Sequence, residues 1–250
     1  MPDIYNVIWF VLVGVLFTGY AILDGFDLGV GGLHLLTKRD RDRRVFLNAI
    51  GPFWDGNQVW LVTGGGALFA AFPHVYATAF SGFYVAFILL LFTLVFRGVS
   101  IHVRSLREAP AWRRGRDAAF SVSSLLASLL IGVALGNVAW GVPLEEGFRY
   151  RGSLIGQLHP YAILTGLMVV AMFLMHGAIY LVMKTEGDLN RQVRGWVRPA
   201  IIAFTLMYAL VTMATLLFVP HLAAPFREHP VLLVVPILSV LAIANIPRAV

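Results

Sequence analysis

The chain has 250 residues, of which 59% are hydrophobic and only 13% are charged, and its mean hydropathy is +0.80. Because a soluble domain usually carries about 25% charged residues, this composition excludes a water-soluble globule and indicates an integral membrane protein. The formal net charge of +6 does not indicate nucleic-acid binding, since the basic residues cluster in short segments between apolar runs.

Seven apolar runs approach the length of about 20 residues that crosses the hydrocarbon core of a bilayer. They are continuous rather than alternating, which favours helices over the strands of a barrel. The sequence therefore predicts an all-α integral membrane protein, a polytopic transmembrane helical bundle of about seven spans that forms one domain over residues 1–250. In chain order the spans are predicted over residues 8–36, 59–80, 82–96, 118–140, 161–183, 199–219 and 230–246.

The loops between these spans differ sharply in charge. Of the 19 Lys and Arg residues, 16 follow the first, third, fifth and seventh spans, and only Arg149, Arg151 and Arg227 lie on the other side. Since Lys and Arg in short loops stay in the cytoplasm, the N-terminus is predicted outside and the C-terminus inside. The opening MPDIYN has an acid and no base, so the first span is predicted to be a retained helix rather than a cleaved signal peptide.

Two acids lie deep in the first predicted span. Counted back from Lys38, Asp27 and Asp24 lie about 16 Å and about 21 Å from its cytoplasmic end. An ionised Asp at the bilayer centre costs roughly 2.5 to 3.5 kcal/mol on insertion scales, so each one needs a physical reason. Their spacing places them on one helix face, beside Gly25 and Gly29, which permit close helix approach. Two interpretations stay open: polar groups in helix packing, or a proton-relay or haem-propionate environment.

The segment GPFWDGNQVW, residues 51–60, concentrates polar and aromatic side chains at the start of the second span. Polar groups this dense at membrane depth usually face protein or a water-filled cavity. We expect Asp55 to be buried there, where a carboxyl holds its proton more readily and is suited to relay protons near neutral pH. The alternative is an Asp that caps the second helix. All three acids lie towards the cytoplasmic side, so the protons they carry are expected to come from the cytoplasm.

The histidines and methionines offer little for metal ligation. Only His176 of the seven histidines lies well inside a span, and no two histidines have the i, i+4 spacing of a helical metal site. A hydrogen bond at a helix contact is therefore the favoured role of His176, ahead of axial haem ligation. Met168, Met172 and Met175 recur at helical spacing, which indicates packing. The chain also has no cysteine, so no metal site is predicted in it.

Four sequence runs together resemble subunit II of cytochrome bd ubiquinol oxidase. The resemblance covers most of residues 5–220, and the second and longest run is highly specific. The runs are GYAILDGFDLGVG (19–31), NAIGPFWDGNQVWLVTGGGALFAAFPHVYATAFSGFY (48–84), GVALGNVAWGVPL (132–144) and HGAIYLVMKTEGDLNRQVR (176–194).

This resemblance implies a heterodimeric terminal oxidase of an aerobic respiratory chain, which takes electrons from quinol and reduces dioxygen to water. In that family haem b and haem d belong to the haem-bearing subunit I, so this chain is expected to bind no cofactor alone and to be active only in the complex, which also takes up quinol and quinone. Other expected partners are a small single-helix accessory subunit and membrane lipid, but not nucleic acid. The implied location is the bacterial or archaeal cytoplasmic (inner) membrane.

The resemblance also assigns roles to individual residues. Asp55 resembles the carboxylate on a cytoplasmic proton route towards the haems, a route to which Asp24 and Asp27 are added. Trp60, together with Trp54, resembles the mouth of a hydrophobic oxygen channel. Asp27 matches an acid associated with the haem environment. The full group of candidates for a subunit contact or the haem environment is Asp27, Asn57, Gln58, Gly25 and Gly29.

One feature departs from the family pattern. Family members are usually longer and have two more spanning helices, so we expect a chain that is truncated at its C-terminus relative to the family. Two other functions stay open. The acids and interrupted helices also suit a proton-coupled membrane transporter, although such proteins usually contain an internal repeat and none is found here. The third possibility is a purely structural stabilising subunit.

Overall fold

The computed structural model describes residues 3–147 and 149–249. Within these residues the regular structure is helical, as predicted, and one isolated β-bridge joins Leu144 to Tyr150 in the long loop after α6. The helices are α1 (Ile4–Leu33), α2 (Asp40–Ile50), α3 (Trp54–Ala71), α4 (Pro73–Gly82), α5 (Tyr84–Val103), α6 (Pro110–Trp140), α7 (Leu154–Gln157), α8 (Pro160–Lys184), α9 (Gly187–Phe218), α10 (Pro220–Glu228) and α11 (Val234–Ala249), with short 3-10 helices at His34–Leu36, Arg104–Leu106 and Pro230–Leu233.

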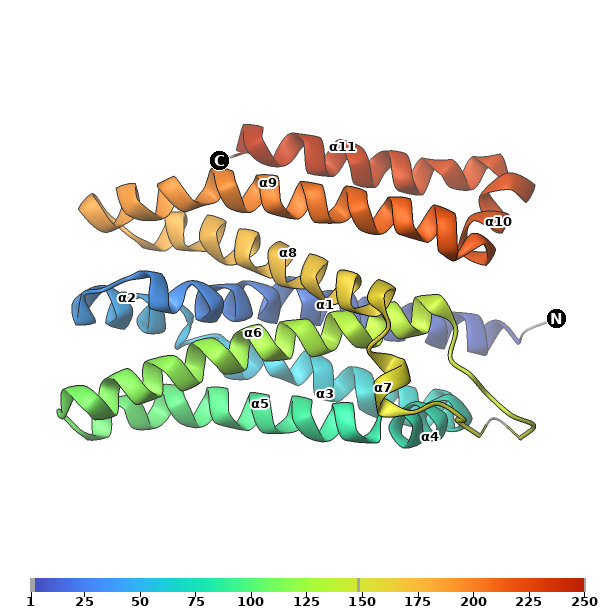
Figure 1. Ribbon diagram of the computed structural model, residues 1–250, viewed down its shortest axis with the longest axis horizontal. Coiled ribbons are helices and arrows are strands. Elements are labelled where there is room, and N and C mark those ends of the chain that lie inside the picture. The colour runs from blue at the N-terminus through green and yellow to red at the C-terminus, as the bar shows by residue number, and fades with distance from the viewer. Residues whose placement is uncertain (1–2, 148, 250) are drawn as a thin grey trace.

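The long helices run side by side along the length of the molecule (Figure 1). α1 packs against α3, α6 and α8, while α5 packs on α6 and α9 on α8. α11 lies beside α9 at the upper edge of the view in Figure 1. The second half of α1 is therefore enclosed, and its buried residues Tyr20, Asp24 and Asp27 face other helices of the same chain.

Among the described residues, six helical segments are long and apolar enough to cross a membrane. They correspond in order to the first and the third to seventh of the predicted spans. Their bounds are Ile4–Leu36, Tyr84–Leu106, Pro110–Trp140, Pro160–Lys184, Gly187–Phe218 and Pro230–Arg248.

The second span, predicted over residues 59–80, is two helices in the structure. α3 begins five residues earlier, at Trp54, and ends at Ala71, and α4 begins at Pro73. Phe72 between them has φ −133° and ψ 62°, outside the helical region. Because a proline disfavours helical geometry in the residue before it, Pro73 sets this break. The prediction of one continuous second span is therefore wrong.

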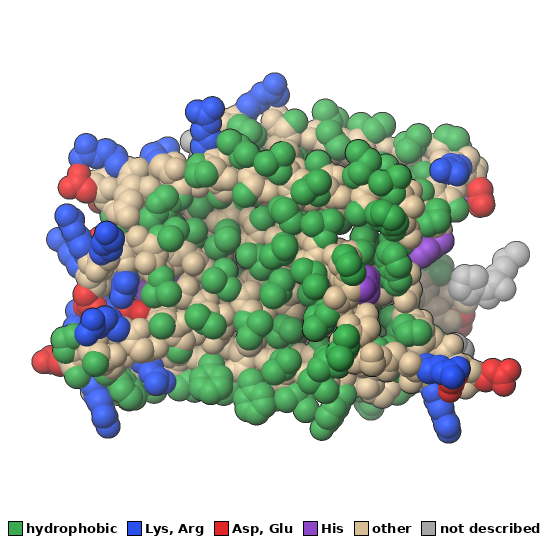
Figure 2. Space-filling model, viewed as in Figure 1, with side chains coloured by type: hydrophobic (Ala, Val, Ile, Leu, Met, Phe, Trp, Pro, Cys, Tyr) green, Lys and Arg blue, Asp and Glu red, His purple; other side chains and the backbone are tan. Residues whose placement is uncertain are grey.

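The surface of the bundle is apolar along its flank and charged at its ends. Figure 2 shows hydrophobic side chains over the flank, and Lys and Arg gathered mainly at the left end. We call this end, where the connections α1–α2, α5–α6 and α8–α9 lie, the basic end. An apolar flank between charged ends is the distribution expected of a bundle surrounded by lipid.

α1 and α8 approach each other closely at two glycines. A Cβ atom added to Gly29 would overlap the carbonyl oxygen of Phe173, and one added to Gly177 would overlap the backbone of Gly29. Small residues at such a crossing let two backbones approach, which strengthens van der Waals packing inside a membrane bundle. The two glycines therefore fix how deeply α8 sits against α1.

We predict that Gly29→Ala destabilises the protein by about 3 kcal/mol or more, because the new methyl group must push α8 away from α1. Thermal unfolding in detergent measures the effect. The matched control is Gly195→Ala on α9, where an added Cβ meets nothing within 4 Å. That control should be neutral or stabilising by up to about 1 kcal/mol, because alanine favours helix over glycine. Equal melting temperatures for the two variants would contradict the prediction.

Candidate functional site

A group of buried polar side chains lies inside the bundle, where α1, α3 and α5 meet. Arg97 of α5 and Asp24 of α1 are both fully buried. The Arg97 guanidinium donates two hydrogen bonds to the Asp24 carboxylate, from Nη1 to Oδ2 at 2.8 Å and from Nη2 to Oδ1 at 2.7 Å. This two-pronged geometry is the strongest form of a charge-assisted pair. We call the whole group, Tyr20, Asp24, Asp27, Asn57 and Arg97, the central cluster.

Asp27 extends the central cluster towards α3. Its Oδ2 atom lies 3.9 Å from Arg97 Nη2 and accepts a hydrogen bond of 2.8 Å from Asn57 Nδ2. Asn57 Nδ2 also donates to the carbonyl oxygen of Leu23, at 3.1 Å. Among the described residues, Asp27 Oδ1, Arg97 Nε and Tyr20 Oη have no hydrogen-bond partner. With two carboxyl groups for one guanidinium, the cluster can hold one extra proton without leaving a net charge.

Arg97 is the member of the central cluster that the charge pattern misplaces. The pattern puts it in a basic inner loop after a span that ends at residue 96, whereas α5 continues to Val103 and buries Arg97 inside the bundle. The sequence feature that could have revealed this burial is the apolar residues on both sides of Arg97, Phe96 and Val99. An arginine flanked in this way indicates a partner for the two acids of the preceding span.

The glycines expected at a subunit contact or in a haem environment lie against α8 of the same chain. A Cβ on Gly25 would meet the Phe173 ring and approach His176, and Gly29 meets the α8 backbone. Both glycines are buried. Their surface is therefore filled from within the chain, because α8 packs along this face of α1.

Asp55 is exposed in this chain, which corrects the expectation of a buried carboxyl. It lies in the first turn of α3, at the end of that helix nearer the basic end. The helix is capped by Phe53 with no side-chain hydrogen bond, so Asp55 is not a hydrogen-bonded cap either. The physical reason is helix rotation: Trp54 and Asn57 point into the bundle, and successive residues lie about 100° apart, so Asp55 points outward.

The outward side of α3 carries Asp55 at its start, followed by a row of apolar side chains. Asp55, Val59, Val62 and Phe69 are all exposed, and Val62 reaches 73% exposure. Their spacing of three, four and seven residues places them along one helix face. We call these four residues the outer face of α3. No described helix of this chain covers it.

The two tryptophans beside Asp55 face different neighbours. Trp54 is buried against α5, where its ring meets His102 in an edge contact at 5.5 Å and lies against Gly98. Trp60 is half-buried against α1, where Gly19 leaves room for its indole ring. Gln58 is half-buried, and its Nε2 atom has no partner among the described residues.

An apolar cavity of about 290 Å³ lies between α1, α3, α5, α6 and α8. Tyr20 of the central cluster contributes to its wall, and so does Leu61, the neighbour of Trp60. The cavity therefore reaches the central cluster on one side, and on another side its wall includes the exposed Leu135 and Val138 of α6. Other side chains that line it include Phe17, Phe83, Phe87, Ile131 and Phe173.

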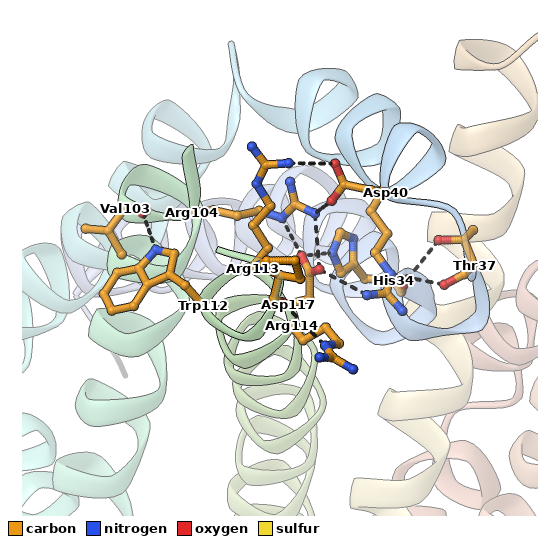
Figure 3. Close-up of polar contacts among 11 residues, drawn as sticks. His34, Thr37, Asp40, Val103, Arg104, Trp112, Arg113, Arg114 and Asp117 are labelled. Carbon is orange, nitrogen blue, oxygen red and sulfur yellow. Dashed lines mark hydrogen bonds and ion pairs between the residues drawn. The ribbon is translucent and has the colours of Figure 1, made fainter. Parts of the chain in front are cut away.

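A second ionic cluster ties the helices together at the basic end (Figure 3). Buried Asp117 of α6 accepts a hydrogen bond from His34 Nε2 at 2.8 Å, one from Arg43 Nη1 at 3.1 Å and two from Arg104. Asp40 of α2 in turn accepts a bond from Arg104 at 2.6 Å. One carboxylate thus joins residues from four segments of the chain. The charge pattern gives no indication of it, because Asp117 follows a run of arginines that indicates only topology.

His176 and His159 are placed as packing and capping groups. His176 is half-buried and meets the Phe26 ring at 5.8 Å in an edge contact between α8 and α1. His159 is the N-cap of α8, where burial lowers the pKa of its imidazole. Within residues 3–147 and 149–249, no group of three or more His, Asp or Glu side chains is arranged to hold a metal ion.

Comparison with known proteins places this chain among oxidase subunits. Residues 5–249 match the family model described as cytochrome bd terminal oxidase subunit II. Subunit 2 of the cytochrome bd-I ubiquinol oxidase of Escherichia coli (strain K12) is 46% identical over 213 residues, which cover 83% of this chain and 56% of that protein. Subunit 2 of the cytochrome bd ubiquinol oxidase of Bacillus subtilis (strain 168) is 37% identical over 213 residues, 82% of this chain and 63% of that protein.

A solved structure shares the fold. The bd oxidase from Geobacillus thermodenitrificans matches with a TM-score of 0.69 and 19% identity, over 83% of this chain and 64% of the matched chain. The alignment with the Escherichia coli relative spans little more than half of that protein's length.

We predict that Arg97→Leu destabilises the protein by about 3 to 5 kcal/mol, because it leaves Asp24 buried without its partner. The double variant Asp24→Leu/Arg97→Leu removes both charges and should recover most of that loss. Thermal unfolding in detergent measures both. As a control, Arg191→Leu removes the partner of exposed Asp188 and should change stability by less than about 1 kcal/mol. A double variant no more stable than Arg97→Leu would show that the pair is not the source of the effect.

Proposed function

The chain belongs to the cytochrome bd terminal oxidase subunit II family, and from that premise we propose that it is the haem-free subunit of a quinol oxidase. In this reaction two quinols give four electrons and four protons, and one dioxygen molecule becomes two water molecules. The partner is a haem-bearing subunit I that holds haem b and haem d and exchanges quinol for quinone. A small single-helix subunit and lipid complete the assembly in the cytoplasmic membrane. The two relatives named as subunits of ubiquinol oxidases support this proposal.

The donor chemistry of this chain supports placing the haems in the partner. Axial haem ligands are imidazole, thioether, thiolate or phenolate side chains that face a pocket large enough for the macrocycle. The wall of the apolar cavity holds one such group, Tyr20, which is buried in the central cluster. His176 lies between α1 and α8, packed against Phe26, and the apolar cavity of about 290 Å³ has no histidine in its wall. These residues do not fit a haem, and no step of the reaction is assigned to one held here.

The observation that carries the proposal is the outer face of α3. An ionised carboxylate at membrane depth costs roughly 2.5 to 3.5 kcal/mol when it faces lipid, so Asp55 needs polar groups from another chain. Val59, Val62 and Phe69 continue the same face as an apolar strip that a partner helix can cover. We therefore place subunit I against this face, with Asp55 in the contact.

Asp55 in that position is suited to pass protons from the cytoplasm to the partner's haems. It lies on the partner side of α3 and at the end of the helix nearer the basic end, which the charge distribution assigns to the cytoplasm. A carboxylate held between two chains is shielded from bulk water and can accept and release a proton during turnover. Asp27 contributes from the opposite side of α3, where its unpartnered Oδ1 atom makes the central cluster a proton store.

The apolar cavity supports a role in oxygen access. Dioxygen is apolar and partitions into apolar space, and this cavity lies inside the bundle beside α3. Trp60 stands next to Leu61 of the cavity wall, and Gly19 leaves the space that its indole occupies. We assign Trp60 to the mouth of the oxygen route. Trp54 supports the route indirectly, since it packs α3 against α5.

We predict that Asp55→Asn leaves haem content and assembly near normal but lowers quinol-driven oxygen consumption per haem. Asn keeps the volume of Asp but cannot titrate, and a relay that limits turnover contributes about 10²- to 10⁴-fold, so a loss of at least about tenfold is expected. Oxygen-electrode rates divided by haem absorbance give the measurement.

The matched control is Asp188→Asn, which removes an exposed acid at the start of α9 near the basic end and should leave turnover unchanged. If the subunit is purely structural, Asp55→Asn should instead reduce assembly of the complex. Oxygen consumption should then fall only in proportion to the amount of assembled complex, with turnover per haem unchanged. Unchanged turnover per haem in Asp55→Asn removes Asp55 from any required proton route.

A further inference from the structure

Two arginines stack on one tryptophan at the basic end, where α5 meets α6. The guanidinium carbons of Arg107 and Arg116 lie 4.9 Å and 4.6 Å from the centroid of the Trp112 ring. The Trp112 Nε1 atom donates a 3.0 Å hydrogen bond to the carbonyl oxygen of Val103, which Figure 3 shows. The ring is thus fixed to the end of α5, and it holds both guanidinium groups in place.

These two arginines have no acidic partner among the described residues. Arg104 and Arg113, their basic neighbours, form ion pairs with Asp40 or Asp117. None of the ion pairs of the described chain includes Arg107 or Arg116, and the buried Arg116 Nε atom has no hydrogen-bond partner. Two guanidinium groups are therefore held on one ring, and neither forms an ion pair within the described chain.

The start of α6 adds to this positive charge. The helix begins at Pro110 with Ala109 as its N-cap, which forms no side-chain capping bond, and its first turn contains no acid. A helix N-terminus carries a partial positive charge and normally favours Asp or Glu there. Here the sequence instead places Arg113 at the end of the first turn and Arg114 directly after it. An anion from outside the chain would therefore balance the positive charge of this helix end and its arginines.

We propose that Arg107, Arg116 and Trp112 bind the phosphate group of an anionic phospholipid. A guanidinium is planar and offers paired N–H donors that match phosphate oxygens, and a stacked guanidinium loses less freedom on binding. Trp favours the membrane–water interface, and basic sites there attract anionic headgroups. This site is separate from the proposed proton and oxygen routes.

The surface beside the arginines suits a lipid rather than a free anion. Leu106, which precedes Arg107, is 75% exposed, and Val99 on α5 and Val122 on α6 are exposed along the helices below it. Leu106 gives the acyl chains an apolar surface beside Arg107, and the exposed valines continue the apolar surface further along α5 and α6. Inorganic phosphate would contact the guanidinium groups but would leave the apolar side chains exposed.

The test is a titration of the chain, purified from membranes with any partner that stays bound, with phosphatidylglycerol, followed by native mass spectrometry. The variant is Arg107→Gln/Arg116→Gln. Because a basic residue near an anionic lipid surface contributes about fivefold in affinity, the double variant should bind about 25-fold more weakly. The control is Arg194→Gln/Arg198→Gln on α9, which removes two exposed arginines that form no ion pair in the described chain. It should leave the affinity of this site unchanged.

A third variant keeps every charge. Trp112→Leu removes the ring that positions the guanidinium groups, and it should weaken phosphatidylglycerol binding several-fold even if the double variant fails to fold. Phosphatidylcholine, which has no net charge, should bind the original protein more weakly than phosphatidylglycerol does.

Three results overturn the proposal. The first is equal affinity for phosphatidylglycerol in the original protein, the double variant and Trp112→Leu. The second is an equal loss in the Arg194→Gln/Arg198→Gln control, which would show that only total charge matters. The third is tight binding of inorganic phosphate that the double variant abolishes while phosphatidylglycerol binding persists, since the site would then belong to a free anion.

Discussion

The buried pair of Arg97 and Asp24 is the interaction on which the arrangement of the first helices depends. A charge inside a bundle in lipid is tolerated only with a partner, and here each ion satisfies the other through two hydrogen bonds. The pair joins α5 to α1, and the bond from Asn57 to Asp27 joins α3 to the same point. Three helices therefore share one polar centre in an apolar bundle, and their rotations about their own axes are set together.

The rotation of α3 follows from this centre and determines what the chain offers to other molecules. Since Asn57 must face Asp27, Trp54 turns towards α5 and Asp55 turns outward with Val59 and Val62. The same helix thus has an inner side that completes the central cluster and an outer side that begins with a carboxylate. At the basic end, the bonds of Asp117 to three basic side chains hold the ends of the helices together in the same way.

Composition and hydropathy were sufficient to predict a helical membrane bundle, and the family resemblance is confirmed by the match over residues 5–249. Hydropathy could not show the break at Phe72, because Pro73 acts through local backbone sterics. Charge counting assigned Arg97 to a loop, since it treats each basic residue as a topology signal. The outward position of Asp55 depends on the rotation of α3, which a bond to another helix determines. Contacts between residues that are distant in the sequence are therefore what a single sequence does not predict.

The most direct test of this account asks what covers the outer face of α3 in the intact membrane. A photo-crosslinking amino acid at Val62, the most exposed of the three apolar positions, reports the neighbours of that face without purification. The account predicts a covalent adduct with a second membrane protein that carries haem. It also predicts that the yield falls in the Arg97→Leu background, where the polar centre that orients α3 is broken. Adducts with lipid alone, in both backgrounds, would contradict it.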